Sequence, residues 1–436
     1  MQKLMIISSD CHAGALPEAY EQYMDAEHRG ASRAWWLAYA REMTSRAGTF
    51  FDQESVEHFA EKSGASLDRL RAFSDAGTRP SDEQLLAMLY DASSPFAPRR
   101  GEYDVAQRTR DLDADGVAAE VIFPQMAPFG AGLMQYRFDV TREQSLAGCR
   151  AYNRWLADLC SANPSRHAGV ALIDVEDIDV TVQEVEAARE LGLFGGVLLP
   201  TSTGRHPFYH HPRYERLWAA CADLGMPLHS HSGWSPDYGD LPSATPMYIS
   251  EVDMWAQRPF TALLWSGAFE RHPALRYVMT ETGVGFMVEK LRVLQFKVDN
   301  PIFRHFKHGL SRTPREYFER QCFIGASFLT PHEGQFRRQL GVGKLMWGSD
   351  YPHLEGTWPD SLRALRETFG GWDEAEIRAI LGENAARVYG FDVSALRKLA
   401  DEIGPSLAAI RGEDERAAAH RLGERSRRSA GGATGP

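Results

Sequence analysis

The alternation of short apolar runs with helical stretches predicts an α/β fold, a (β/α)8 TIM barrel. Eight such runs occur, at 4 to 8, 120 to 124, 169 to 173, 196 to 200, 226 to 231, 276 to 280, 322 to 326 and 344 to 348. Most of them lack a polar face, which is typical of parallel strands that are covered on both sides. Their number favours a closed barrel over an open sheet.

The stretches between the runs have helical periodicity. Residues 180 to 193 and 214 to 226 carry apolar side chains at three- and four-residue spacing, with a glycine close to the end of each. We expect them to be crossover helices of the barrel.

Three other segments do not fit a barrel crossover. The segment 13 to 112 is too long for one and is rich in helix formers, so we expect a helical cap inserted after the first strand. Residues 372 to 391 contain two helical stretches that follow the last strand. We therefore predict one barrel domain over 1 to 395, cap included. A C-terminal helix and a tail are expected over 396 to 436, and the tail should be disordered from about residue 412, where apolar residues become scarce.

Composition restricts the classes of partner. The formal net charge of −11 on 436 residues disfavours nucleic acid, because phosphate binding needs a basic surface. No apolar stretch approaches the roughly 20 residues of a membrane helix, and the first apolar run ends without an export cleavage site. The five cysteines lie far apart, which argues against a disulfide framework. We expect a cytoplasmic protein with a small-molecule substrate and no membrane partner, and a homo-oligomer is compatible with this.

Polar side chains stand where the predicted strands end. In a (β/α)8 barrel the carboxyl ends of the strands form the active-site face. The residues there are Asp10 and His12 after strand 1, His229 and His231 in strand 5, Glu281 after strand 6 and Asp350 after strand 8. Taken singly, each could be a helix cap, a loop histidine or an ion-pair partner. Together they would be costly to bury without a cation, so all six are candidate metal ligands.

The types of donor restrict the metal. Imidazole and carboxylate suit zinc, manganese and iron, and the absence of thiolate argues against a closed structural zinc site. We expect a divalent Zn, Mn or Fe, as one or two ions. His229 and His231 lie at i and i+2 and so point to the same side of a strand. His229 is then either a second ligand or a group that supports His231.

Motifs at several strand ends resemble those of a known family. They are the D-x-H pattern after strand 1, the histidine that ends strand 5, "GSDYPHLEGTWPDS" (348 to 361) and "ENAARVYGF" (383 to 391). With them the chain resembles the amidohydrolase superfamily, in its amidohydrolase-related branch. That branch includes aminocarboxymuconate semialdehyde decarboxylase and the resorcylate-type decarboxylases. The resemblance extends over residues 1 to 395, apart from the cap.

The resemblance implies a set of ligands and one departure from it. By position, Asp10, His12, His231 and Asp350 match the metal ligands of the family. Glu281 stands where decarboxylases and many hydrolases carry a histidine. Strand 4, "GVLLP", lacks the lysine that is carbamylated in some two-metal members, so Glu281 could take over the bridging role.

The same residues admit two mechanisms, in which Asp350, Glu281 and His229 are the candidate catalytic groups. In the first, which the resemblance favours, one metal activates water and polarises a substrate oxygen. The reaction is then hydrolysis or non-oxidative decarboxylation of a small organic substrate that bears a carboxylate. In the second, two iron or iron/manganese ions activate dioxygen in a monooxygenase (hydroxylase) reaction. A non-catalytic partner subunit is disfavoured, because the ligand positions are filled.

Three more residues are candidates for substrate binding. Trp234 and Tyr238 follow the strand 5 histidines, and His353 lies three residues after Asp350. Aromatic walls are common in small-molecule sites. The sequence does not identify the substrate, because the pocket depends on contacts made by the cap and the loops.

Overall fold

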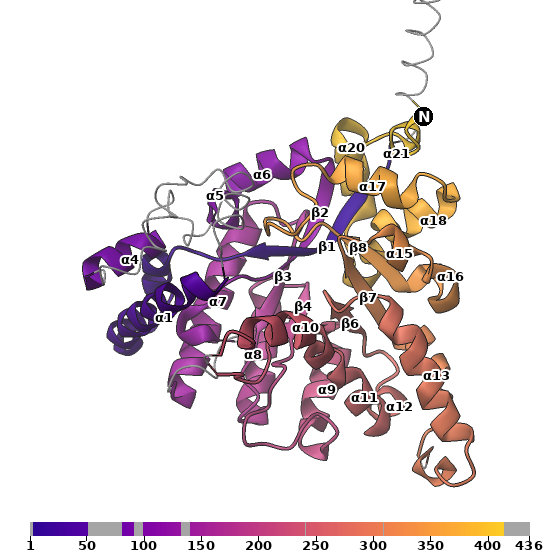
Figure 1. The fold of residues 1–436 in the computed structure, drawn as a ribbon, viewed down its shortest axis with the longest axis horizontal. Coiled ribbons are helices and arrows are strands. Elements are labelled where there is room, and N and C mark those ends of the chain that lie inside the picture. Colours follow the sequence, from indigo (N-terminus) through magenta and orange to yellow (C-terminus); the bar gives the residue numbers. More distant parts are fainter. Residues whose placement is uncertain are drawn as a thin grey trace, which may run out of the picture.

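The computed structural model describes residues 3–50, 81–90, 99–131, 140–239, 241–307 and 309–413. Its centre is one sheet of eight parallel strands in chain order (Figure 1). The strands are β1 (Ile6–Ala13), β2 (Val117–Pro124), β3 (His167–Leu172), β4 (Gly196–Leu198), β5 (Leu228–His231), β6 (Tyr277–Thr280), β7 (Cys322–Ser327) and β8 (Leu345–Gly348). Each overlaps one of the eight predicted runs, so the predicted barrel is confirmed.

β1 and the end of β8 close the barrel. Cys11 forms a parallel bridge with Tyr351. The amide of Asp350 donates to the carbonyl of Asp10 at 2.9 Å, and the amide of His12 donates to the carbonyl of Tyr351 at 2.6 Å. Because these bonds join the first strand to the segment after the last one, the sheet closes on itself.

Helices follow the strands around the outside of the barrel (Figure 1). Between β2 and β8 they are α7 (Arg142–Ser161), α8 (Ile178–Glu190), α9 (Glu215–Asp223), α10 (Ala244–Ala256), α11 (Arg258–Trp265), α12 (Ala268–Arg271), α13 (Gly285–Asp299), α14 (Pro314–Gln321), α15 (Pro331–Gly334) and α16 (Arg337–Leu340). Short helical turns are η3 (Pro128–Gly130), η5 (Pro212–Tyr214), η6 (Arg304–Lys307) and η7 (Val342–Lys344). The crossover helices predicted at 180 to 193 and 214 to 226 correspond to α8 and α9.

The segment between β1 and β2 is helical where the structure describes it. Its elements are η1 (Pro17–Gln22), η2 (Ala26–His28), α1 (Arg29–Phe50), α4 (Asp82–Tyr90), α5 (Arg100–Tyr103) and α6 (Val105–Ala114). Figure 1 shows α1 and α4 to one side of the strands. Residues 51–80 and 91–98 of the predicted cap lie outside the described residues. Among the described helices, none has the length and apolar character needed to cross a membrane.

The helices after β8 pack against the barrel. They are α17 (Ser361–Phe369), α18 (Glu374–Arg378), η8 (Ala379–Glu383), α19 (Asn384–Tyr389), α20 (Val393–Ile403) and α21 (Leu407–Ile410). α20 buries Leu396 and Ala400, and the amide of Leu4 donates to the carbonyl of Pro405 at 2.9 Å. The predicted domain boundary at residue 395 therefore falls inside α20. The tail predicted to be disordered lies outside the described residues from 414 onward.

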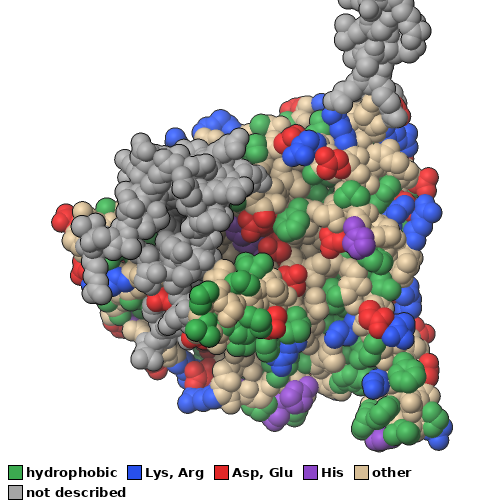
Figure 2. All heavy atoms as spheres, in the orientation of Figure 1, with side chains coloured by type: hydrophobic (Ala, Val, Ile, Leu, Met, Phe, Trp, Pro, Cys, Tyr) green, Lys and Arg blue, Asp and Glu red, His purple; other side chains and the backbone are tan. Residues whose placement is uncertain are grey.

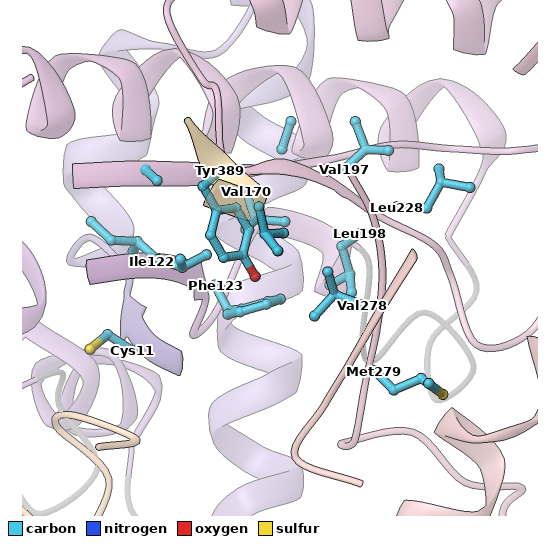
Figure 3. Packing of buried hydrophobic residues seen from close by; sticks show 14 of the residues in the cluster. Cys11, Ile122, Phe123, Val170, Val197, Leu198, Leu228, Val278, Met279 and Tyr389 are labelled. Carbon is cyan, nitrogen blue, oxygen red and sulfur yellow. The ribbon is translucent and has the colours of Figure 1, made fainter. Parts of the chain in front are cut away.

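An apolar layer fills the barrel beneath the strand ends. Figure 3 shows Phe123, Val170 and Leu198 from three strands close to Tyr389 of α19. All four side chains are buried. A packed layer of this kind leaves the polar residues at the carboxyl ends to form the site, as in other (β/α)8 barrels.

Candidate metal centre

β1 presents Asp10 and His12 through an irregularity in its pairing. Ser8 pairs with Glu120 and Cys11 pairs with Ile122, so β1 has an extra residue relative to β2 between these points. Such bulges re-aim side chains and are over-represented next to active sites. Both Asp10 and His12 are buried, with exposed fractions of 0% and 2%. The sequence placed these two residues after the strand, whereas they belong to β1 itself.

β8 brings Asp350 next to β1. Gly348 allows the close approach, because a Cβ at this position would lie 2.6 Å from the Cβ of Asp10. Asp350 then has a φ of 57°, a conformation that costs free energy in a residue with a side chain. The hydrogen bond from its amide to Asp10 helps to hold this conformation.

Four residues bring their donor atoms close together around His12: Asp10, His12, His231 and Asp350. Its Nε2 lies 3.4 Å from Oδ1 of Asp10 and 3.3 Å from Oδ1 of Asp350. His231 Nε2 lies 3.2 Å from the same oxygen of Asp10. Asp10, His12 and His231 form one group of donors that could hold a metal ion, and His12, Asp350 and His353 form another. The four ligands that the resemblance implied thus lie in two groups that share His12.

The orientation of the two imidazoles suits metal binding. His12 Nδ1 faces the carbonyl of Pro124 at 3.3 Å, and His231 Nδ1 faces the carbonyl of Ser232 at 2.9 Å. A carbonyl oxygen accepts a hydrogen bond, so each ring carries hydrogen on Nδ1 and presents Nε2 as a ligand atom. His12 Nε2 and both carboxylate oxygens of Asp350 are buried and make no hydrogen bond within the described part of the chain. The residues present therefore fit a divalent cation.

Burial and neighbouring charge set the pKa values of the site. Burial alone would raise the pKa of Asp10, but His231 and His12 outweigh it and hold this pKa well below its usual range. Burial likewise opposes the charged form of both histidines. Asp10 and Asp350 nevertheless raise the pKa of His12 to about 10, and Asp10 and Glu281 raise that of His231 to about 9. Without a metal, both rings are therefore protonated on both nitrogens and positively charged at neutral pH.

His229 lies away from these donors. Its Nε2 faces the carbonyl of Gly195 at 2.9 Å, and its ring stacks on Tyr389 at 5.8 Å between centroids. Burial lowers the pKa of His229 to about 3, so the ring is neutral. No group of three or more donors found among the described residues includes it. Of the two roles left open by the sequence, this geometry disfavours that of a second ligand.

Glu281 lies on the other side of His231. Its Oε2 is 3.3 Å from His231 Nδ1 and accepts a hydrogen bond from the hydroxyl of Ser232. Glu281 also has a positive φ, 52°. Burial, together with the negative charge of Asp350 and Asp10, raises the pKa of Glu281 to about 7. The site thus pairs one carboxyl group that holds a proton near neutral pH with two that do not.

The three predicted substrate residues stand at the mouth. His353 Nδ1 lies 2.8 Å from Asp350 Oδ1, and its ring stacks on His12 at 4.0 Å between centroids. Trp234 and Tyr238, in the loop after β5, are half-buried and lie against Trp255 of α10. The Tyr238 hydroxyl donates to Glu251 at 2.5 Å. In Figure 2, histidine and acidic side chains reach the surface together near the middle of the face shown.

The sequence did not point to two polar neighbours of the site, Ser327 and Gln125. The hydroxyl of Ser327 donates to Oδ2 of Asp10, and Gln125 Oε1 accepts from His353 Nε2 at 2.5 Å. Ser327 ends β7 and Gln125 follows β2. Both could have been found by examining the polar residue at the end of every strand, including strands that carry no charged group.

Comparison with known proteins identifies the family of the chain. The model of the amidohydrolase family matches residues 97–391, which is more than half of the chain. The chain belongs to this family. It is 28% identical over 272 residues to the gamma-resorcylate decarboxylase of Rhodococcus jostii (strain RHA1), a match that spans 58% of this chain and 79% of the relative. The gamma-resorcylate decarboxylase of Polaromonas sp. (strain JS666 / ATCC BAA-500) is 24% identical over 56% of this chain and 76% of its own length.

Solved structures share the fold of this amidohydrolase-family chain. The 5-carboxyvanillate decarboxylase of Sphingomonas paucimobilis superposes with a TM-score of 0.58 at 18% identity, over 89% of this chain and 100% of that one. A dihydroxybenzoic acid decarboxylase from Polaromonas sp. JS666, solved with manganese and 2-nitroresorcinol, gives a TM-score of 0.51 at 18% identity. That match covers 70% of this chain and 93% of the other. The resemblance identified from the strand-end motifs is therefore confirmed.

Proposed function

We propose that this chain is a divalent-metal-dependent decarboxylase of a small aromatic carboxylate. One observation carries the proposal: His12 Nε2 and both oxygens of Asp350 are buried without a hydrogen bond, next to Asp10 and His231. The relatives give the reaction class, because the two gamma-resorcylate decarboxylases match more than half of the chain.

Four residues would hold the ion: Asp10, His12, His231 and Asp350. Manganese is the ion we propose, since carboxylate and imidazole donors suit it and two solved decarboxylases of the same fold contain it. A bound divalent ion supplies positive charge that neutralises and orients the anionic substrate. Ser327 and the carbonyls of Pro124 and Ser232 would keep the ligands in place, as outer hydrogen-bond partners of metal sites do.

Glu281 is the acid that we propose for the reaction. Non-oxidative decarboxylation breaks the bond between the ring carbon and the carboxylate, releases CO2 and requires one proton on that ring carbon. Burial and the charges of Asp350 and Asp10 raise the pKa of Glu281 to about 7 in the metal-free chain, and we propose that Glu281 also holds its proton with the ion bound. Its Oε2 accepts from Ser232, so Oε1 is the oxygen that carries the proton. Trp234 and Tyr238 would form the aromatic wall against the substrate ring.

The position of His229 weakens the case for a monooxygenase. A two-metal monooxygenase would require His229 as a metal ligand. The Nε2 atom of His229 instead faces the carbonyl of Gly195. The named relatives are decarboxylases. Hydrolysis would use the same ion and the same four ligands, and it ranks second because the relatives that match by sequence bear decarboxylase names.

We also propose a cytoplasmic location. All five cysteines are buried and free, as expected for a protein that remains in a reducing compartment. A small-molecule substrate agrees with the buried, polar centre of the site.

The test is turnover without oxygen. Protein loaded with Mn²⁺ is incubated anaerobically in D2O with 2,6-dihydroxybenzoate and with 5-carboxyvanillate, and the products are analysed by mass spectrometry. We expect CO2 and a ring product with one deuterium in place of the carboxylate from at least one of the two. Glu281→Gln should keep the metal and lose roughly 100-fold or more in kcat. Failure of both substrates to lose CO2, with metal bound, would refute the proposal.

A further inference from the structure

A second group of donors lies at the mouth, beside the first. Glu281, Asp350, His353 and Glu355 each offer a ligand atom, and these four atoms all lie within 4.8 Å of one another. We propose that this group is a second divalent-cation site, which binds Mn²⁺ next to the ion held by Asp10 and His231. The proposal is independent of the reaction that the chain catalyses.

His353 has the orientation of a ligand. Its Nε2 lies 2.5 Å from Oε1 of Gln125, an acceptor, so this nitrogen carries the hydrogen. Nδ1 is then the nitrogen left for a cation, and it lies 2.8 Å from Asp350 Oδ1, its ion-pair partner in the metal-free chain. Stacking on His12 fixes the ring. An imidazole with one nitrogen held by an outer partner and the other aimed at carboxylates is the usual arrangement of a metal-binding histidine.

Asp350 links the two groups and provides an independent observation. Its exposed fraction is 0%, and neither of its oxygens accepts a hydrogen bond within the described residues. It faces His12 at 3.3 Å and His353 at 2.8 Å, one from each group. Carboxylates placed between two donor sets serve two-metal centres, whose ions are about 3.5–4 Å apart.

The balance of charge also favours a second cation. One divalent ion offsets the two carboxylates of Asp10 and Asp350. Glu281, which becomes a carboxylate when a cation binds, and the exposed Glu355 remain beside them. Across the described part of the chain, no ion pair joins Glu281, Asp350 or Glu355 to a lysine or arginine. Several carboxylates with one imidazole suit a hard divalent cation such as Mn²⁺.

Occupancy of this site would affect Glu281. A cation bound there holds Glu281 as its carboxylate, so binding at the second site and proton donation by Glu281 exclude one another. If the first ion supports decarboxylation, Glu281 must be free to donate its proton during turnover. The second ion must therefore bind with lower affinity than the first. The ligand set also differs from the one that the sequence suggested for two ions, since His353 and Glu355 replace His229.

The test measures bound metal. Metal-free full-length protein is titrated with Mn²⁺, and free Mn²⁺ is followed by electron paramagnetic resonance. We expect two ions per chain, the second bound more weakly. Glu355→Gln and His353→Gln should each raise the second dissociation constant at least tenfold, and Glu355→Gln should leave the first within about twofold. Glu367→Gln, an exposed carboxylate on α17 outside the group, is the control and should keep both ions.

Two results would overturn the second site: saturation of the wild-type chain at one ion in millimolar Mn²⁺, or retention of the second ion in both Glu355→Gln and His353→Gln. Because the readout is bound Mn²⁺, a failed decarboxylation assay leaves this inference standing. If the chain decarboxylates a substrate but saturates at one ion, the proposed function is supported and the second cation site is refuted.

Discussion

Neighbouring groups set the pKa of three histidines near the site, His12, His229 and His231, to very different values. All are buried, and burial alone disfavours the protonated ring. Carboxylates raise the pKa of His12 to about 10 and of His231 to about 9. His229 faces a carbonyl instead, and its pKa falls to about 3. Only the first two have the carboxylate neighbours that a metal centre requires.

These pKa values predict that metal affinity rises with pH. The metal-free site holds protons on His12 and His231 up to about pH 9, and an ion that binds through both nitrogens must displace them. Release of two protons corresponds to about a hundredfold gain in affinity per pH unit between pH 7 and 8. Competition titrations with a chelator at pH 7.0, 7.5 and 8.0 measure it. An affinity that does not change over this range would show that the rings are already neutral.

The sequence revealed which residue types gather at the strand ends. It did not reveal which of them face the centre of the site. Asp10, His12 and Asp350 could be expected there, because parallel strands bring their carboxyl ends to one face. His229 and His231 share a side of β5, yet His231 Nε2 faces Asp10 while His229 Nε2 faces the carbonyl of Gly195. Which of the two reaches the ion depends on the register of β5 within the barrel. That register is set by long-range pairing, which local sequence does not show.

At the scale of elements, a buried ion-pair network connects the first three strands to the cap. Arg108 of α6 donates through Nε and Nη2 to Glu120 of β2, at 2.5 and 2.7 Å. Its Nη1 donates to the carbonyls of His12 and Gly101, at 2.8 and 3.0 Å. His167 Nδ1 of β3 lies 2.8 Å from the same glutamate. Through Arg108, α6 therefore fixes the backbone carbonyl of His12, a proposed metal ligand.

Removing one partner of this network should be strongly destabilising. Arg108→Met leaves the charge of Glu120 buried without its main partner, and we expect a loss of about 3–5 kcal/mol in the free energy of unfolding. Arg150→Met breaks the partly exposed pair with Glu184 and should cost about 1 kcal/mol or less. Denaturant titration of both variants gives the comparison. Equal losses would indicate that the buried pair adds nothing beyond an exposed one.

At the scale of the whole molecule, the site depends on closure of the barrel. Asp10 and Asp350 are 340 positions apart in the chain, and the bond between the amide of Asp350 and the carbonyl of Asp10 joins them. The last helices secure the same closure, since the amide of Leu4 donates to Pro405. The strand pattern predicted the barrel, but it could not reveal that β1 runs on to Ala13, because residues 11 to 13 are polar or small and belong to the strand only through their pairing with β2 beyond the irregularity.

The most direct test of the account is the position of the tightly bound ion. Crystals of the protein with one equivalent of Mn²⁺ are measured at the manganese absorption edge, and the anomalous difference map locates the metal. We predict a single strong peak in contact with Asp10, His12, His231 and Asp350, with His229 still directed at the carbonyl of Gly195. A strongest peak bound by His229, or one that Asp10 and His12 do not contact, would contradict the account.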